Sequence, residues 1–277
     1  MGGAGATGGG GPEAAFGDRI VVLAPHMDDE TLGCGGLLAL LSPTREIDVV
    51  FATDGSGSPA PPGGRAGDPA RLAALREEEA AEALCVLGVP RGRLHFLRFP
   101  DGGLARNETG LRQALAATAA GWGPAEFLVP FRQDWHPDHL AAYRAAAAAL
   151  AAGDLKGRLV EYFVYTRRRL LPGGDVRAYV RPSRLARVPI EAVADRKLGA
   201  LGRYRSQTTL FYPGQGRPVL GPELVRRACE EPECFLTPAP DGEDRGGLRV
   251  GGLIRAATLL EPALKRLKDR VWAGGAR

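Results

Sequence analysis

The sequence lacks the features that mark membrane, secreted and nucleic-acid-binding proteins. It has no run of about 18 apolar residues, the length that a transmembrane helix needs. Its start, MGGAGATGGGGPEAAFGD, lacks the basic and apolar parts of a signal peptide, and Ala6 stands where a myristoylation motif has Ser or Thr. The formal net charge of +4 is too small to indicate a nucleic-acid partner. We therefore expect no stable membrane insertion and no nucleic-acid binding, with residues 1–17 as a flexible Gly-rich tail.

Cysteine and histidine are scarce, with four of each in the 277 residues. The cysteines stand at positions 34, 85, 229 and 234, and no two of them form a CxxC pair. This pattern does not indicate a disulfide framework, and it favours a reduced, cytoplasmic protein.

The order of apolar segments predicts the fold. Up to residue 152, short apolar runs typical of buried strands alternate with helical patterns, which predicts a parallel, Rossmann-like sheet. After that point two expected strands, 158–165 and 176–188, follow each other without a long helix, and a helix over 190–205 comes next. We predict one α/β domain over residues 18–277, with a mostly parallel sheet flanked by helices and a C-terminal antiparallel extension. An amphipathic helical stretch is expected at 253–271.

The first polar cluster follows directly on a buried strand. The apolar run at 20–24 ends in PHMDDE, and a Gly-rich turn at 33–36 is expected to lead into a helix. His26 and Asp29 are three residues apart, so a tight loop can turn both toward one point. Nitrogen and carboxylate ligands suit Zn²⁺, and Asp28 would be left free beside the metal.

A second cluster, DWHPDH at residues 134–139, also lies between an apolar run and a helix. Three of the four histidines fall in the two clusters. Strand-to-helix transitions of a parallel sheet share one edge, so the two clusters are expected to meet. Three ligands with an open coordination position are typical of a catalytic zinc. The simpler interpretation, a helix N-cap, accounts for Pro137 and Asp138 but for neither histidine.

PHMDDE, TLGCGG and WHPDH, in this order, resemble the motifs of the PIG-L/LmbE-like family of metal-dependent N-acetylglucosaminyl deacetylases. The matches run from residue 20 to residue 207. The resemblance implies that Arg76 and Asp101 contact the substrate, and that KLGALGRYRSQ at 197–207 packs beside the active site. Some family members carry a Tyr just before HPDH, where Asp134 and Trp135 stand here, so an oxyanion-stabilising Tyr is not carried over.

We interpret the chain as a zinc-dependent hydrolase that removes an N-acetyl group from an N-acetylglucosamine-type sugar or glycoconjugate. His26, Asp29 and His139 are expected to hold Zn²⁺, with Fe²⁺, Mn²⁺ or Co²⁺ as alternatives. The expected partner is a small acetylated sugar, and a homo-oligomer remains open.

The remaining residues of the two clusters are assigned to proton transfer and orientation. Asp28 is expected to take a proton from water. A protonated His136 is expected to stabilise the oxyanion or to deliver a proton to the leaving amine. Asp134 and Asp138 are expected to orient the metal-binding histidines.

Two other functions are weighed against this one. A Rossmann-type module could bind a nucleotide at residues 33–36, although GCGG is not GxGxxG. A metal amidase could act on a non-sugar amide such as a thiol conjugate. Two further segments stay open: the loop at 56–69 as a lid or filler, and the Arg-rich stretch 158–187 as charged edge strands or, less favoured, a wall facing an anionic substrate.

Overall fold

The computed structural model describes residues 16–61, 68–167, 171 and 173–238. Within this part of the chain, seven strands form one sheet in the order β3-β2-β1-β4-β5-β7-β6. The strands are β1 (Arg19–Ala24), β2 (Glu46–Thr53), β3 (Leu94–Phe99), β4 (Ala125–Pro130), β5 (Gly157–Tyr162), β6 (Leu185–Val188) and β7 (Glu233–Leu236). The first five are parallel, whereas β7 runs antiparallel to β5 and to β6. The predicted fold, a mostly parallel sheet with an antiparallel extension, is confirmed.

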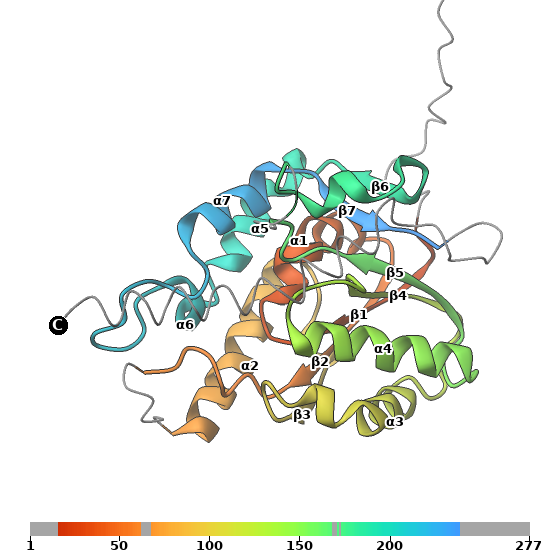
Figure 1. Cartoon of the computed structure of the whole chain (residues 1–277), viewed down its shortest axis with the longest axis horizontal. Helices are drawn as coiled ribbons and strands as arrows, with labels where there is room; N and C mark the ends of the chain where they lie inside the picture. The colour runs from red at the N-terminus through yellow and green to blue at the C-terminus, as the bar shows by residue number, and fades with distance from the viewer. Residues whose placement is uncertain (1–15, 62–67, 168–170, 172, 239–277) are drawn as a thin grey trace, which may run out of the picture.

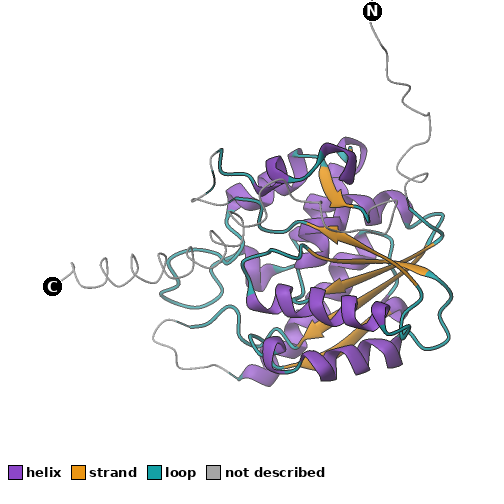
Figure 2. Ribbon diagram, turned by 45° about the vertical axis from the view of Figure 1, so that its right-hand side comes forward, coloured by secondary structure: helices purple, strands orange, loops and turns teal. Residues whose placement is uncertain are grey.

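Helices cover both faces of the sheet (Figure 2). The α-helices are α1 (Asp29–Leu41), α2 (Pro69–Val86), α3 (Glu108–Thr118), α4 (Pro137–Ala151), α5 (Ala194–Leu201), α6 (Arg205–Thr208) and α7 (Pro222–Glu230). One apolar core joins the sheet to α1, α2 and α5, and a second joins the opposite face to α3 and α4 (Figure 1). Both layers follow from strands that are apolar on two faces, since each face needs a helical cover.

The strand order reverses between β1 and β4. The chain builds outward from β1 through β2 to β3, and then returns to place β4 on the other side of β1. In open α/β sheets, ligands bind at such a switch point, beyond the carboxyl ends of the two strands. The two polar clusters follow β1 and β4, so this topology brings together segments about 110 residues apart in sequence.

The glycines at 33–36 lie inside α1 and not in a turn before it, which corrects the sequence prediction. Helix α1 begins at Asp29, and its glycines allow close packing. A Cβ on Gly33 would clash with the ring of Tyr162, and one on Gly36 would clash with the side chain of Ile190. These residues are buried against side chains, so they offer no place for a phosphate. The nucleotide-binding alternative is therefore set aside.

We expect Gly36→Ala to destabilise the fold by about 1–3 kcal/mol, because the added methyl group overpacks the contact with Ile190. Denaturant unfolding measures the change in the free energy of unfolding. Gly110→Ala is the matched control. Gly110 lies in α3, where a Cβ would stand 3.4 Å from Phe99, so alanine should be neutral or stabilising by up to about 1 kcal/mol. Equal effects of the two changes would contradict this account of α1.

A buried ion pair fixes the middle of α1 to β7. The Lys197 ammonium donates to a Glu233 carboxylate oxygen at 2.6 Å and to the carbonyl of Leu32 at 2.9 Å. Glu233 also accepts from the backbone amides of Gly36 and Leu37, at 2.6 and 2.8 Å. In an ideal helix the amide of Gly36 would bond to the carbonyl of Leu32. The ion pair thus adds a contact to both of these groups, and each of its charges is compensated where it is buried.

The second half of the chain differs from the prediction in several places. The strand expected at 158–165 ends at Tyr162 and belongs to the parallel part of the sheet. Only Leu185–Val188 of the strand expected at 176–188 is extended in the sheet, because Asp175 caps a 3-10 turn and Pro182 starts another. The helix expected at 190–205 is broken after Leu201. Strand β7 and helix α7 were not predicted.

The chain ends are only partly described. Phe16 is 5% exposed and its ring packs edge-on against Phe235 at 5.4 Å, so the packed structure begins before residue 18, the predicted start of the domain. Residues 1–15 and the stretch 253–271 lie outside the described residues. In the part that is described, no helix combines the length and apolar character needed to cross a membrane.

Candidate active site

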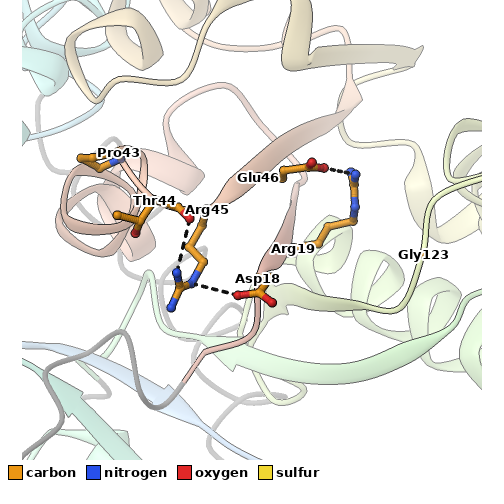
Figure 3. Close-up of a pocket in the computed structure, with 7 residues that line it drawn as sticks. All are labelled: Asp18, Arg19, Pro43, Thr44, Arg45, Glu46 and Gly123. Atoms are coloured by element: carbon orange, nitrogen blue, oxygen red, sulfur yellow. Dashed lines mark hydrogen bonds and ion pairs between the residues drawn. The ribbon is translucent and has the colours of Figure 1, made fainter.

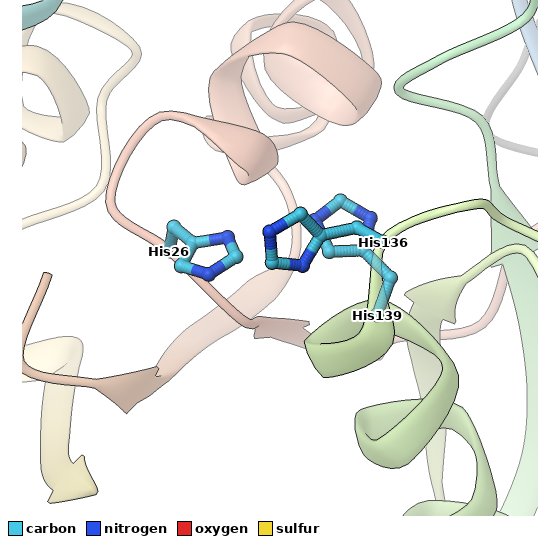
Figure 4. A group of neighbouring side chains, drawn as sticks. All are labelled: His26, His136 and His139. Atoms are coloured by element: carbon cyan, nitrogen blue, oxygen red, sulfur yellow. The ribbon is translucent and has the colours of Figure 1, made fainter. Parts of the chain in front are cut away.

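The two polar clusters meet beyond the carboxyl ends of β1 and β4. His26 comes from the loop after β1, and His136 and His139 come from the start of α4, with the three rings turned toward one another (Figure 4). Ring centroids of His26 lie 4.7 Å from His136 and 5.5 Å from His139. Each histidine offers a nitrogen within 4.8 Å of the other two. The sequence prediction that these segments converge fits this arrangement.

Asp29 places a carboxylate oxygen between two of the histidines. Its Oδ2 lies 3.0 Å from His26 Nδ1 and 3.1 Å from His139 Nε2. All three side chains are largely buried, and His139 is fully so. One oxygen of Asp29 thus contacts both His26 and His139, while the group of three nitrogens that lie within 4.8 Å of one another belongs to His26, His136 and His139.

The donor atoms at this point fit a divalent metal ion. Neither ring nitrogen of His139 makes a hydrogen bond of good geometry, although both are buried and lie near carboxylates. Two nitrogen or oxygen ligands of one tetrahedral Zn²⁺ lie roughly 3.3 Å apart without pointing at each other, given bonds of about 2.0–2.1 Å. The contact between Asp29 and His139 has this character, whereas Asp29 and His26 also meet at hydrogen-bond geometry. A set of imidazole nitrogens with one carboxylate is typical of zinc, iron, manganese and cobalt sites.

The charge balance of the cluster points the same way. Burial lowers the pKa of His139, but Asp29 and Asp134 raise it to about 9. Burial likewise opposes protonation of His26, yet Asp101, Asp138 and Asp29 raise its pKa well above the ordinary value. Carboxylates outnumber cationic groups here, so the site favours added positive charge. A divalent cation would supply that charge.

Asp134 and Asp138 lie at the second nitrogens of the two histidines. Asp134 Oδ2 is 3.3 Å from His139 Nδ1, and Asp138 Oδ2 is 3.3 Å from His26 Nε2. Asp138 also accepts from the backbone amides of Gly102 and Leu104, at 2.8 and 3.1 Å. Carboxylates in this position fix the ring orientation of metal-binding histidines. These contacts are those that an orienting role requires, and that role stays a prediction for both residues.

His136 is the N-cap of α4, which the sequence analysis did not foresee. Its Nδ1 accepts a hydrogen bond from the backbone amide of Asp138 at 3.2 Å. Burial, followed by repulsion from His26 and His139, lowers the pKa of His136 to about 4. The ring is therefore neutral near pH 7, with its proton on Nε2. The protonated His136 of the sequence prediction does not fit this hydrogen bond, because a protonated ring has no nitrogen free to accept from the Asp138 amide.

Asp28 has a strained backbone at the head of α1. Its φ of 151° and ψ of −26° lie in a region that residues with a Cβ seldom adopt. Such strain costs about 1–3 kcal/mol and collects at functional sites. Burial raises the pKa of its carboxyl group to about 7, although Arg76 opposes that rise. Asp28 thus has the surroundings of a group that exchanges a proton near neutral pH.

Arg76 lies beneath the site and is not at its surface. Its side chain is 1% exposed, and its guanidinium donates to the carbonyls of Met27, Gly55 and Ser58, at 2.6, 3.1 and 3.2 Å. It also lies 3.4 Å from Asp28 Oδ2. The substrate contact expected from the family resemblance does not fit this burial. The sequence could not show that this helix turns a charged face inward.

Asp101 connects the loop after β2 to the histidine cluster. Its Oδ1 is 3.3 Å from His26 Nε2, and its Oδ2 accepts from the Gly57 amide at 3.1 Å. Although burial raises the pKa of Asp101, His26 leads the groups that lower it, to about 2. The side chain is 11% exposed, so contact with a sugar hydroxyl stays a prediction.

Several buried polar residues form hydrogen bonds next to the site. The Glu79 carboxylate accepts from the backbone amide and hydroxyl of Ser206, and Gln207 donates to the Ser58 carbonyl at 3.1 Å. Tyr204 donates its hydroxyl to Glu30. The tract at 197–207 thus packs beside the site, as the resemblance implies. Glu30 itself was not predicted, although its place beside Asp28 and Asp29 was a signal.

Three of the described arginines of the stretch 158–187 have partners away from the histidines. Arg158 pairs with Glu126, and Arg177 pairs with Asp175 and Glu231. Arg184 donates to the Thr237 carbonyl at 2.5 Å. These contacts favour a structural role over a wall for an anionic substrate, whereas residues 168–170 lie outside the description.

A cavity of about 550 Å³ lies at the opposite end of the sheet, near the amino ends of β1, β2 and β4 (Figure 3). Its charged groups neutralise one another, since Arg19 pairs with Glu46 and Arg45 with Asp18. The residues that line it include no histidine or cysteine and none of the groups that could hold a metal ion. We therefore place the functional site at the histidine cluster.

Comparison with known proteins gives a family match and several relatives. Residues 21–150 match the PIG-L family, described as GlcNAc-PI de-N-acetylase, which confirms the resemblance seen in the motifs. The 2'-N-acetylparomamine deacetylase of Streptomyces fradiae is 28% identical over 261 residues, which cover 81% of this chain and 91% of that protein.

Two solved structures share the fold. A conserved protein of Thermus thermophilus is 29% identical, with a TM-score of 0.56 over 80% of this chain and 94% of its own. The N,N'-diacetylchitobiose deacetylase of Pyrococcus horikoshii is 21% identical, with a TM-score of 0.52 over 70% of this chain and 72% of its own.

Proposed function

Because residues 21–150 form a PIG-L family domain, we propose that this chain is a metal-dependent deacetylase of N-acetylated amino sugars or glycoconjugates. The observation that supports the reaction type best is that one Asp29 oxygen contacts both His26 and His139, next in sequence to Asp28 with its strained backbone. The amino-sugar substrate is inferred from the Streptomyces relative.

His26, Asp29 and His139 would hold the ion, and Zn²⁺, Fe²⁺, Mn²⁺ and Co²⁺ all accept these donors. When bound, such an ion polarises an amide carbonyl and makes a water molecule more acidic. The chain's own residues fix the ligands, because Asp134 and Asp138 hold the far nitrogens of the two histidines.

Asp28 takes the proton of the attacking water as the new carbon–oxygen bond forms. It then passes the proton to the leaving nitrogen as the carbon–nitrogen bond breaks, which yields acetate and a free amine. His136 has a different task, since a neutral ring with its proton on Nε2 has no acidic proton to release. It donates a hydrogen bond to the carbonyl oxygen as negative charge develops there.

The test is acetate release from a panel of acetylated compounds. We would assay N-acetylglucosamine, N,N'-diacetylchitobiose, 2'-N-acetylparomamine and an N-acetylcysteine conjugate, measuring acetate and free amine separately. The proposal expects equal amounts of both products from at least one amino sugar. If only the cysteine conjugate were turned over, the proposed substrate would be a thiol conjugate and not an amino sugar.

A further inference from the structure

The peptide bond between Met27 and Asp28 is held at both of its polar atoms. The Met27 carbonyl accepts from Arg76 Nη2 at 2.6 Å, and the Asp28 amide donates to Glu30 Oε2 at 3.1 Å. Rotation about φ of Asp28 turns this peptide plane relative to the side chain. Fixing both atoms therefore fixes φ of Asp28 at its strained value of 151°.

The following peptide and the side chain of Asp28 are held as well. The Asp28 carbonyl accepts from the amide of Leu32 at 2.9 Å, within the first turn of α1. The Asp28 carboxylate lies 3.4 Å from the same Arg76 nitrogen that bonds to Met27. One guanidinium thus contacts both the peptide before Asp28 and the carboxylate itself.

The two holding residues are themselves anchored in the protein. Glu30 is buried and accepts hydroxyl hydrogen bonds from Thr31 and Tyr204. Arg76 donates to the carbonyls of Gly55 and Ser58 in addition to that of Met27. A buried guanidinium with four oxygen partners and 1% exposure has no surface to offer a substrate. Its partners point to a role toward Asp28.

We propose that Arg76 and Glu30 are positioning residues that clamp the Met27–Asp28 peptide and hold the carboxylate of Asp28 in place for proton transfer. This inference rests on the proposed function only in taking Asp28 as the base. Without the clamp, Asp28 would relax to a negative φ, and its side chain would swing away from its present position. The strained backbone of Asp28 is thus required to keep its carboxylate in this position.

The conformational part of the proposal is tested by stability, without reference to activity. Asp28→Gly and Asp28→Ala both remove the carboxylate, but only glycine accepts a φ of 151° freely. The glycine variant should melt about 2–4 °C higher than the alanine variant in the otherwise unchanged protein. In an Arg76→Met background this difference should fall by at least half, because residue 28 can relax.

The clamp would be refuted if the Asp28→Gly and Asp28→Ala melting temperatures differed as much in the Arg76→Met background as in the unchanged protein. Contacts other than those of Arg76 would then impose the positive φ of residue 28. Should Arg76→Met fail to fold, Arg76→Lys serves as the second background. Its single ammonium cannot hold all four oxygen atoms, so the difference should still narrow. If the difference in melting temperature between Asp28→Gly and Asp28→Ala were unchanged in the Arg76→Lys background, the clamp would also be refuted.

The catalytic part is tested by kinetics and metal analysis. Arg76→Met should lower kcat by about 10-fold or more with KM and bound metal nearly unchanged, and Arg76→Lys should recover part of the loss. A substrate contact would instead raise KM with kcat preserved, which would overturn the proposal. Arg71→Met, on the exposed face of the same helix, is the control and should behave as the unchanged protein. If no substrate is found, the melting experiment still decides on the clamp.

Discussion

Asp28→Asn is expected to keep the metal and to lower kcat by roughly 10²–10⁴-fold, the usual contribution of a positioned general base. Asparagine preserves the shape of the side chain but cannot take a proton near neutral pH. Asp29→Asn is expected to behave differently, because Asp29 Oδ2 lies within 3.1 Å of both His26 and His139. A neutral amide in that place should lower metal occupancy first, and excess metal should restore part of the activity.

Two histidine variants complete the comparison. His139→Ala should resemble Asp29→Asn, and His136→Ala should resemble Asp28→Asn, with bound metal measured by elemental analysis beside turnover. The histidines alone could also hold an ion, since their nitrogens lie within 4.8 Å of one another. In that case His136→Ala would lose the metal and Asp29→Asn would keep it. Metal loss in Asp28→Asn alone would reverse our assignment of ligand and base.

Removal of divalent ions is expected to reduce turnover to the background rate. The buried cluster around Asp29 carries more carboxylates than cationic groups, and no group among those described there replaces the Lewis acidity of a metal ion. Adding back one equivalent of Zn²⁺, Fe²⁺, Mn²⁺ or Co²⁺ in separate experiments should restore activity, and the most effective ion identifies the preferred metal.

Thermal stability gives a second measure of metal binding. A ligand present at about 1,000 times its dissociation constant stabilises the folded state by roughly 4 kcal/mol. The metal-free protein should therefore melt at a higher temperature when the ion is added, whereas His139→Ala should respond weakly. Full activity of a preparation shown to be free of metal would refute the metal-dependent mechanism.

The sequence was sufficient for the first half of the fold and for the meeting of the two clusters. Buried parallel strands are nearly continuous apolar runs, and their carboxyl ends share an edge, so His26 and His139 could be expected together. The strand pattern near the C-terminus was weaker. Strand β7 has only four residues, and its acidic Glu233 is buried through a partner 36 residues earlier, Lys197.

Burial and backbone angle were beyond the reach of sequence patterns. Arg76 lies in a highly charged helix that looks solvent-exposed in sequence, and only the packed structure shows that its guanidinium faces inward. Similarly, the positive φ of Asp28 depends on the orientation of the peptide plane before it, and the capping role of His136 depends on where α4 begins. Residue identity alone carries neither kind of information.

The position of β7 sets an order of events during synthesis. Strand β6 leaves the ribosome before β7, yet within the described sheet β6 pairs only with β7. Until residues 233–236 emerge, β6 has no strand to pair with, and Lys197 lacks its carboxylate partner. All residues of the histidine cluster are thus synthesised about a hundred residues before β7, the last strand of the described sheet. From the time that residues 157–162 are made until β7 is added, β5 presents an open edge to any other chain nearby.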